Sequence, residues 1–213
     1  MQSYYPKDDN AILEINLKAL SKNYKLIKKN LKTTTECAAT VKADAYGIGA
    51  IKVVKRLIAD GCKTFFAAHL SESVELRKIS KKIRIFCYHG IDEKNYREFI
   101  KFNIIPIANS IDQLNLIQKL NRKKKFNQSI AVHFDTGMSR LGLDENETNQ
   151  FINNKTKYNS LKIDLIMSHL ACGDQIKHSM NTKQLEKFSS IRKHFPNSKA
   201  SLANSAGIFI NKK

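Results

Sequence analysis

CAATVKADAYGIGA, residues 37–50, begins the pattern that decides the fold. Its first half, 37–43, is a short run of small and β-branched residues that predicts a strand, and the two glycines after it predict a tight turn. The same order recurs down the chain, with longer amphipathic segments between the short runs. Further strands are expected at 12–16, 64–69, 83–88, 104–108, 129–135, 162–168 and 199–203. Such alternation is typical of right-handed βαβ units around a parallel sheet.

The seven strands from residue 37 onward lie roughly 20 to 35 residues apart, a spacing that suits a (β/α) TIM-type barrel. An open doubly wound sheet has nearly the same periodicity and stays an alternative. Pro106 counts against the strand at 104–108, because a proline gives no N–H to a ladder. Polar residues three apart mark three helix starts: Ser110 with Gln113, Asp144 with Glu147, and Asn181 with Gln184.

The composition is that of one soluble globular domain. The chain has 213 residues, of which 42% are hydrophobic and 26% are charged. Its apolar runs are too short to span a membrane, and the polar start MQSYYPKDDN is unlike a signal peptide. The four cysteines lie far apart, with no Cys-x-x-Cys pair. We therefore expect a cytoplasmic protein with no metal site and no membrane partner.

The formal charge of +18 raises the alternative of a nucleic-acid-binding protein. The lysines are spread along the whole chain, however, and their longest run is 123–125. Only seven of the 37 basic residues are arginine, the residue that leads in reading bases and phosphates. We interpret the charge as a solvated lysine surface and expect no nucleic-acid partner. Salt-sensitive binding would favour the alternative.

Polar side chains stand at the ends of four predicted strands, where a barrel carries its active site. Lys42 ends the first of these strands, and Tyr46 lies in the glycine turn after it. A partly desolvated lysine can act as a nucleophile or base in its neutral form. Taken alone, Lys42 is better explained as a lysine that extends from a strand end into solvent, and Gly47 and Gly49 as a plain β–α turn.

The other three sets are equally ambiguous when each is taken alone. His133 and Arg140 follow the fifth strand, where the arginine could bind an anion or pair with a nearby aspartate. His169 ends the sixth strand, and an isolated histidine there is more often a hydrogen-bonded core residue. Asn204 and Ser205 suit either an ordinary helix cap or a phosphate site. Four polar sets at four strand ends nevertheless indicate a functional site.

Four motifs in a fixed order give the chain a resemblance to a known family. They are VKADAYG at 41–47, DTGMSRLG at 135–142, SHLACGD at 168–174 and NSAG at 204–207. Together they resemble alanine racemases, the pyridoxal-phosphate enzymes of fold type III, and the resemblance runs from about residue 11 to the last residue. It implies interconversion of L- and D-alanine for the supply of cell-wall D-alanine. A pyridoxal-phosphate-binding carrier or homeostasis protein without turnover is the alternative.

The resemblance also implies roles for individual residues. Lys42 would bind the cofactor as a Schiff base and act as one of two catalytic bases. Arg140, near the cofactor's phenolic oxygen, and His169, near its ring, would complete the catalytic set. The residues implied to bind the cofactor are Lys42, Tyr46, Arg140, His169, Asn204 and Ser205. Racemisation needs a base on each face of the substrate, so one lysine is not sufficient.

The sequence departs from the family pattern at position 133 and at its end. Racemases of this family commonly carry a lysine, often carbamylated, where His133 stands. Because a histidine supplies no negative charge, Arg140 is expected to have a different partner. The pattern further implies an eighth strand and a C-terminal β domain, whose tyrosine serves the site of a partner subunit in a homodimer.

We expect this chain to be an incomplete form of that enzyme, with seven of eight barrel strands. On this interpretation, residues 1–17 are a strand segment that joins the β domain, and residues 18–213 are the cofactor-binding barrel. The chain alone is then not expected to racemise alanine.

Overall fold

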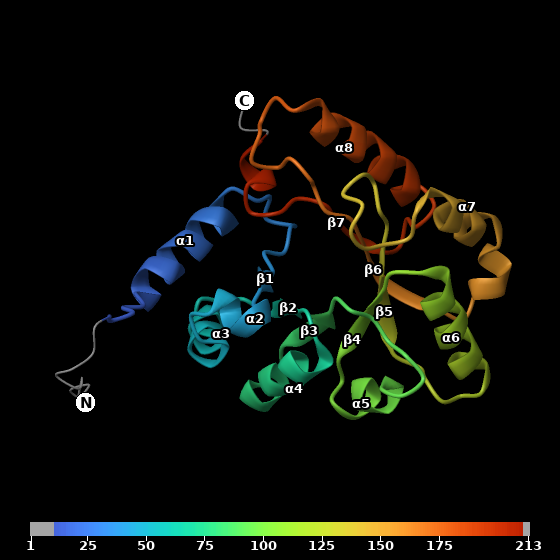
Figure 1. The fold of residues 1–213 in the computed structure, drawn as a ribbon, viewed down its shortest axis with the longest axis horizontal. Helices are drawn as coiled ribbons and strands as arrows, with labels where there is room; N and C mark the ends of the chain where they lie inside the picture. Colours follow the sequence, from blue (N-terminus) through green and yellow to red (C-terminus); the bar gives the residue numbers. More distant parts are fainter. Residues whose placement is uncertain (1–10, 211–213) are drawn as a thin grey trace.

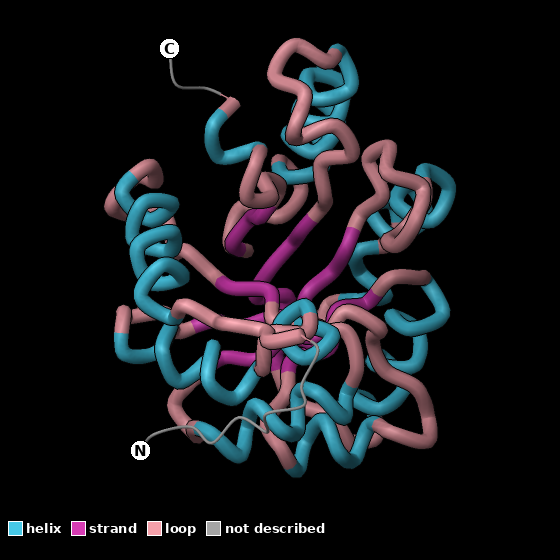
Figure 2. Tube along the Cα trace, turned by 60° about the vertical axis from the view of Figure 1, so that its left-hand side comes forward, coloured by secondary structure: helices cyan, strands magenta, loops and turns pink. Residues whose placement is uncertain are grey.

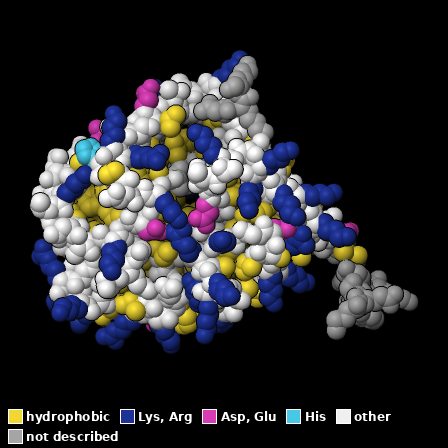
Figure 3. All heavy atoms as spheres, turned by 180° about the vertical axis from the view of Figure 1, so that it is seen from behind, with side chains coloured by type: hydrophobic (Ala, Val, Ile, Leu, Met, Phe, Trp, Pro, Cys, Tyr) yellow, Lys and Arg dark blue, Asp and Glu magenta, His cyan; other side chains and the backbone are white. Residues whose placement is uncertain are grey.

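The computed structural model of the chain describes residues 11–210 (Figure 1). Residues 1–10 and 211–213 lie outside the described residues, and with them most of the predicted segment 1–17 and the end of the predicted barrel unit 18–213. Within the described ranges, no helix is long and apolar enough to cross a membrane. Lysine and arginine side chains are spread over the face seen in Figure 3 and are not gathered over one element.

Seven parallel strands form one sheet, in the spatial order β1-β2-β3-β4-β5-β6-β7. Their bounds are β1 Ala39–Thr40, β2 Thr64–Ala67, β3 Arg84–Cys87, β4 Ile105–Ala108, β5 Ser129–His133, β6 Lys162–Met167 and β7 Lys199–Ser201. Because spatial order equals chain order, the sheet has no reversal of the kind that defines a doubly wound fold. The barrel interpretation is therefore confirmed, as a curled sheet whose β1 and β7 are not paired with each other among the described residues.

Helices surround the strands on the outside of the curl (Figure 2). The α-helices are α1 Leu17–Lys29, α2 Lys42–Tyr46, α3 Ala50–Ala59, α4 Leu70–Ile79, α5 Tyr96–Lys101, α6 Ile111–Arg122, α7 Glu145–Asn153 and α8 Ser179–Arg192. Two short 3-10 helices are η1 Lys155–Tyr158 and η2 Gly207–Phe209. A helix after nearly every strand is what right-handed βαβ connections require.

Alternate residues of the strands belong to two separate hydrophobic clusters, as the pleat of a strand demands. The larger cluster packs the outward side chains, such as Phe65 and Ile85, against the helices. The smaller one fills the interior of the curl with Phe66, Phe86 and side chains from β4 to β6. Phe66 stacks on Phe86 with ring centroids 4.8 Å apart. These side chains therefore pack the interior of the curl.

Charged side chains join the amino ends of distant strands below this packed layer. Arg84 at the start of β3 pairs with Asp164 of β6 across the interior. Glu36, just before β1, lies 3.5 Å from Arg84 and 3.6 Å from the ammonium of Lys199 on β7. The first and last strands are thus connected at this end by side chains, although their backbones are not paired.

The strand expected at 12–16 is not formed among the described residues, because residues 11–16 have no regular structure. Ile12 and Leu13 are 63% and 74% exposed, so this apolar run has no packing partner in the described chain, and its pairing with a further β domain stays a prediction. Asn16 instead caps α1, and its side chain accepts the Ala19 N–H at 3.0 Å.

The strand after residue 37 is shorter than predicted, since the backbone leaves the sheet at Val41 and Lys42 begins α2. Pro106 does lie in a strand, and the ladder of β4 with β3 spans only two residue pairs, Phe86–Ile105 and Cys87–Pro106.

Two of the three predicted helix starts are confirmed. Ser110 caps α6, although the Gln113 side chain accepts the N–H of Asn109 where a capping box would use Ser110. Asp144 and Glu147 form a complete capping box at α7. The start at Asn181 and Gln184 is wrong, because α8 begins at Ser179 with His178 as its cap.

Candidate functional site

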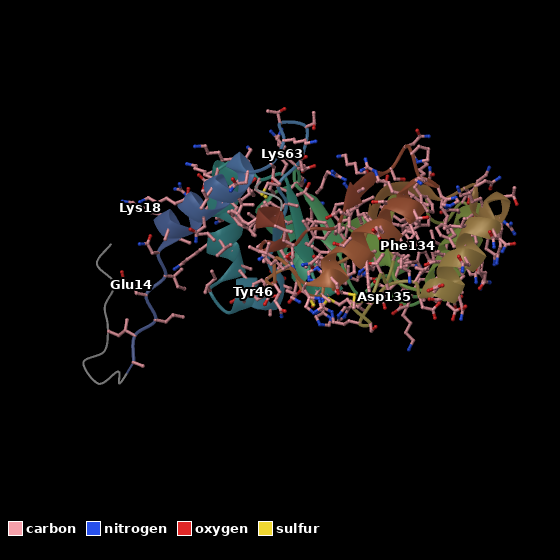
Figure 4. All side chains as sticks on the ribbon, turned by 90° about the horizontal axis from the view of Figure 1, so that it is seen from above. Glu14, Lys18, Tyr46, Lys63, Phe134 and Asp135 are labelled. Atoms are coloured by element: carbon pink, nitrogen blue, oxygen red, sulfur yellow. The ribbon has the colours of Figure 1, made fainter. Side chains whose placement is uncertain are left out.

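A cavity of about 490 Å³ opens at the carboxyl ends of the strands. Its lining comes from five strand ends and the loops after them: Thr40, Lys42, Tyr46, Ala68, Tyr88, His89, His133, Arg140, Leu141, Met167 and His169. Figure 4 shows Tyr46 and Asp135 on one edge of the molecule and Lys63, at the opposite end of the strands, on the other. The cavity thus lies where barrel geometry predicts an active site.

Lys42 enters the cavity at the start of a left-handed turn. Ala43, Asp44, Ala45 and Tyr46 all have φ between 50° and 59°. The left-handed conformation costs roughly 1–2 kcal/mol for each residue with a Cβ, and runs of it are rare. The sequence predicted a turn only at its glycines, and the left-handed run before them is a finding of the structure.

Two carboxylates hold this turn by its backbone. Glu72 on α4 accepts the N–H of Ala43 at 2.7 Å, together with the N–H groups of Ala68 and His69. Asp44 accepts the N–H of Ala50 at 2.7 Å, which ties the turn to the start of α3. Burial raises the pKa of Glu72, but the three N–H donors outweigh it and keep that pKa below its ordinary value.

Arg140 is presented by a loop that is shaped around Asp135. One carboxylate oxygen of Asp135 accepts the N–H groups of Gly137, Met138 and Ser139 at 2.9 to 3.1 Å. Gly142 closes the loop so tightly that a Cβ there would lie 2.8 Å from the Asp135 nitrogen. Within residues 11–210, no acidic side chain pairs with Arg140. Its guanidinium is therefore available to an anion in the cavity.

His133 and His169 line the inner wall as neutral groups. His133 is 6% exposed, and its Nδ1 lies 3.1 Å from the side-chain oxygen of Asn109. Burial, helped by the proximity of the His169 imidazole, lowers the pKa of His133 to about 4. Burial also lowers the pKa of His169, and the positive charges of Arg140 and Lys42 lower it further. Lys42 and Arg140 thus lie close enough to His169 to change its pKa, and all three side chains line the same cavity.

A fully buried glutamine, Gln184 of α8, supports the loops that carry Arg140 and His169. Its Nε2 donates to the carbonyl of His169 at 2.8 Å and to the hydroxyl of Thr136 at 3.1 Å, and its Oε1 accepts the Ala171 N–H at 2.8 Å. The Thr136 hydroxyl lies 2.7 Å from that of Ser168. Gln184, which the sequence marked as a helix start, is in fact the centre of this network.

Sequence reasoning missed the part of the lining that follows β2 and β3. The Tyr88 hydroxyl lies 3.1 Å from that of Thr40, and burial raises the pKa of Tyr88. His89 packs edge-on against His69, with ring centroids 4.2 Å apart. The signal that could have found Tyr88 and His89 is their place at the end of the predicted strand 83–88.

Asn204 and Ser205, by contrast, are not among the lining residues. The side-chain oxygen of Asn204 accepts the Gly207 N–H at 2.9 Å, but the N-cap residue of η2 is Ala206, so the structure does not make Asn204 or Ser205 the helix cap. Ser205 is exposed. Their role at a phosphate stays a prediction. Tyr46 does line the cavity, with its ring centroid 5.9 Å from the Lys42 ammonium, although it is 64% exposed.

The lining as a whole offers a primary amine, a guanidinium, hydroxyls and imidazoles, but no carboxylate within the described residues. Such a cavity favours anionic ligands, because its charged groups are Lys42 and Arg140. It can also form a covalent bond to an aldehyde through the amine of Lys42.

Comparisons with known proteins agree with this geometry. Residues 15–213 match the family described as alanine racemase, N-terminal domain. The alanine racemase of Rickettsia canadensis is 41% identical over 199 residues, which are 93% of this chain and 56% of that protein. A crystal structure of alanine racemase from Bartonella henselae with covalently bound pyridoxal phosphate is 37% identical, with a TM-score of 0.87 over 93% of this chain and 58% of that one.

The alanine racemase structure from E. faecalis, at 24% identity and a TM-score of 0.81, supports the fold alone. The chain spans little more than half the length of the relatives it matches. Because the match covers all of the described strands and all four motifs, the chain belongs to the family of alanine racemase N-terminal domains.

Proposed function

We propose that this chain is the cofactor-binding barrel of an alanine racemase and that Lys42 binds pyridoxal phosphate. The observation that carries the proposal is the cavity, in which the Lys42 amine and the unpaired Arg140 guanidinium stand together without a carboxylate in the lining. An aldehyde that also carries a phosphate needs such a set of donors. The Bartonella henselae relative, in which pyridoxal phosphate is bound covalently, supports the same assignment.

Four lining residues and two residues outside the lining have roles in this proposal. Lys42 holds the cofactor through Nζ, and Arg140 binds an anionic oxygen of it. Neutral His169 offers a hydrogen bond at the inner wall, and we keep Tyr46, Asn204 and Ser205 as phosphate ligands on the resemblance alone. When bound, pyridoxal phosphate withdraws electrons from the Cα of an attached amino acid and makes its hydrogen acidic. The substrate amine would first displace Nζ of Lys42 from the cofactor, and the freed amine would then accept or return that proton on one face.

Alanine is the proposed substrate, because the relatives are named for it. Racemisation requires proton transfer on both faces of Cα, and this proposal gives Lys42 one of them. The protein of which the chain forms a part is proposed to work as a homodimer in the cytoplasm.

The first test is covalent capture of pyridoxal phosphate. The chain is mixed with the cofactor, the bond is reduced with borohydride, and labelled peptides are identified by mass spectrometry. We expect label at Lys42 and its complete loss in Lys42→Ala. Lys52→Ala, which removes an exposed lysine from nearby α3, is the matched control and should label like the wild type. Label spread evenly over surface lysines would contradict the proposal.

The second test distinguishes a racemase from a carrier without turnover. Alanine deuterated at Cα is incubated with the loaded chain, and loss of deuterium is followed by mass spectrometry. Loss that requires Lys42 supports proton transfer by its amine. Capture of the cofactor with full retention of deuterium would favour the carrier.

A further inference from the structure

Glu72 makes more hydrogen bonds than a helix cap needs. It is the third residue of α4, where a glutamate completes a capping box through the N–H of His69, here at 3.0 Å. The same carboxylate also accepts the N–H of Ala68 at 2.8 Å and that of Ala43 at 2.7 Å. The bond to Ala43 joins segments 29 residues apart in the sequence.

The residue held by this bond is the one directly after Lys42. Ala43 is also the first of the four left-handed residues, so the bond fixes the point at which the strained turn begins. Strained backbone persists only where its surroundings hold it in place. Charged acceptors form the stronger hydrogen bonds to N–H groups, which suits a clamp on such a turn.

The other bonds of the turn do not replace this one. The backbone bonds of residues 43–46, such as Ala45 N–H to the Val41 carbonyl at 3.0 Å, lie within the segment itself, and the bond of the Val41 N–H to the Phe66 carbonyl at 2.9 Å ties β2 to the residue before Lys42. Asp44 fastens the far end of the turn to α3. Glu72 is the side chain that joins its near end to the β2–α4 junction, where Ala68 lines the cavity.

We propose that Glu72 is a positioning residue for Lys42, which it directs into the cavity by clamping the Ala43 N–H to the β2–α4 junction. This inference rests on the proposed function, in which Nζ of Lys42 reacts with the aldehyde of pyridoxal phosphate. Glu72 itself touches neither cofactor nor substrate in this assignment. It acts through the backbone on the lysine's direction of approach.

The test compares the rate of borohydride-trapped label at Lys42 in wild type, Glu72→Gln and Glu72→Ala, each corrected for the folded fraction by circular dichroism. A misplacement of about 1 Å can cost on the order of 100-fold in rate. We expect Glu72→Ala to trap about 10- to 100-fold more slowly than the wild type. Glu72→Gln, which keeps one acceptor oxygen, should lie between the two.

Two variants of the same helix separate positioning from stability. Ser73→Ala removes the bond from the Ser73 hydroxyl to the His69 carbonyl, at 3.0 Å, and so weakens the start of α4 without touching Ala43. Glu75→Gln removes a carboxylate from an exposed pair with Lys78. Both should trap at the wild-type rate per folded chain. A readout without cofactor is hydrogen exchange of the amides at 41–46, which should speed up in Glu72→Ala and stay unchanged in Glu75→Gln.

The outcomes are distinct. Equal trapping by wild type and Glu72→Ala would overturn the inference and leave Glu72 as a helix cap, with the proposed function intact. Equal slowing by Glu72→Ala and Ser73→Ala would overturn it as well, because general loosening of α4 would then explain the effect. A wild-type chain that traps no cofactor at Lys42 would overturn the proposed function, and this inference with it.

Discussion

The two sides of the cavity hold their functional side chains in opposite ways. On the β1 side, Lys42 precedes a turn that is largely exposed and strained; the carboxylate of Glu72 accepts a backbone N–H of this turn, and the carboxylate of Asp44 within it accepts the N–H of Ala50 on α3. On the β5–β6 side, the loops of Arg140 and His169 rest on Gln184, a neutral side chain that is fully buried.

The difference follows from solvation. A carboxylate near the surface keeps part of its hydration, so the β1 side can use charge to hold strained backbone. A charge at the position of Gln184 would lose its hydration, which costs far more than burying an amide with its hydrogen bonds made. The β5–β6 side should therefore be sensitive to lost packing and burial, and the β1 side to lost backbone clamps.

The largest expected effect is on the buried side. Gln184→Ala leaves the Ala171 N–H and the His169 carbonyl without this partner and opens a cavity, so we expect it to lower the free energy of unfolding by about 4 kcal/mol. Glu186→Ala, at an exposed position of the same helix, is the control and should change it by less than about 0.5 kcal/mol. Urea unfolding measures both. Equal stability of the two variants would remove the distinction between the two sides.

The next effect is a pH dependence that comes from His133. Its pKa is about 4 in the folded chain, below the ordinary value of 6.5, so the unfolded chain binds more protons between these pH values. Stability should therefore fall as the pH is lowered through this window, by up to about 3 kcal/mol from this group. His133→Asn should flatten the dependence, while His194→Asn, at an exposed position, should not. Urea unfolding at several pH values tests this, and identical slopes for all three chains would refute it.

A smaller effect compares two glycines with positive φ, one on each side. A Cβ at Gly142 would meet backbone atoms of the β5 end, the nearest at 2.8 Å, whereas a Cβ at Gly47 would meet nothing within 4 Å. We expect Gly47→Ala to lower the free energy of unfolding by about 1 kcal/mol, because alanine is strained at a positive φ even where its Cβ has room. Gly142→Ala should lower it by about 2 kcal/mol more, from overpacking. Thermal unfolding measures both variants. Equal losses in the free energy of unfolding would mean that the backbone of the Arg140 loop shifts to accept the added Cβ at little cost.

The strands could be predicted from the sequence because each is a short buried run between turn residues, and six of the seven barrel strands lie within the expected ranges nearly end to end. The rule on βαβ connections predicted parallel strands but not their order, because a doubly wound sheet obeys the same rule. The strand expected at 12–16 is not formed, because a short β-branched run does not by itself show that another strand is there to pair with it. Pro106 shows that a short parallel ladder can contain a residue without an N–H.

The candidate site could be predicted where charged residues stand at a strand end or in the loop after it, as Lys42 and Arg140 do. The residues that hold these two side chains in place could not be predicted. Ala43 and Asp44 carry no sign of a positive φ, and a glutamine three residues after an asparagine looks like a helix start whether it faces solvent or the core. Glu72 and Gln184 act on residues distant in the sequence, so only the folded chain shows their contacts.

The left-handed turn after Lys42 also has a consequence for how the chain folds. Residues other than glycine seldom visit positive φ in an unfolded chain, so four such residues in succession are unlikely to form before α4 and Glu72 are in place. Changes in this segment should then leave the folding rate nearly constant and speed up unfolding. The turn after Lys42 would be among the last segments to form and the first to unfold, while the sheet and the helices around it stay folded.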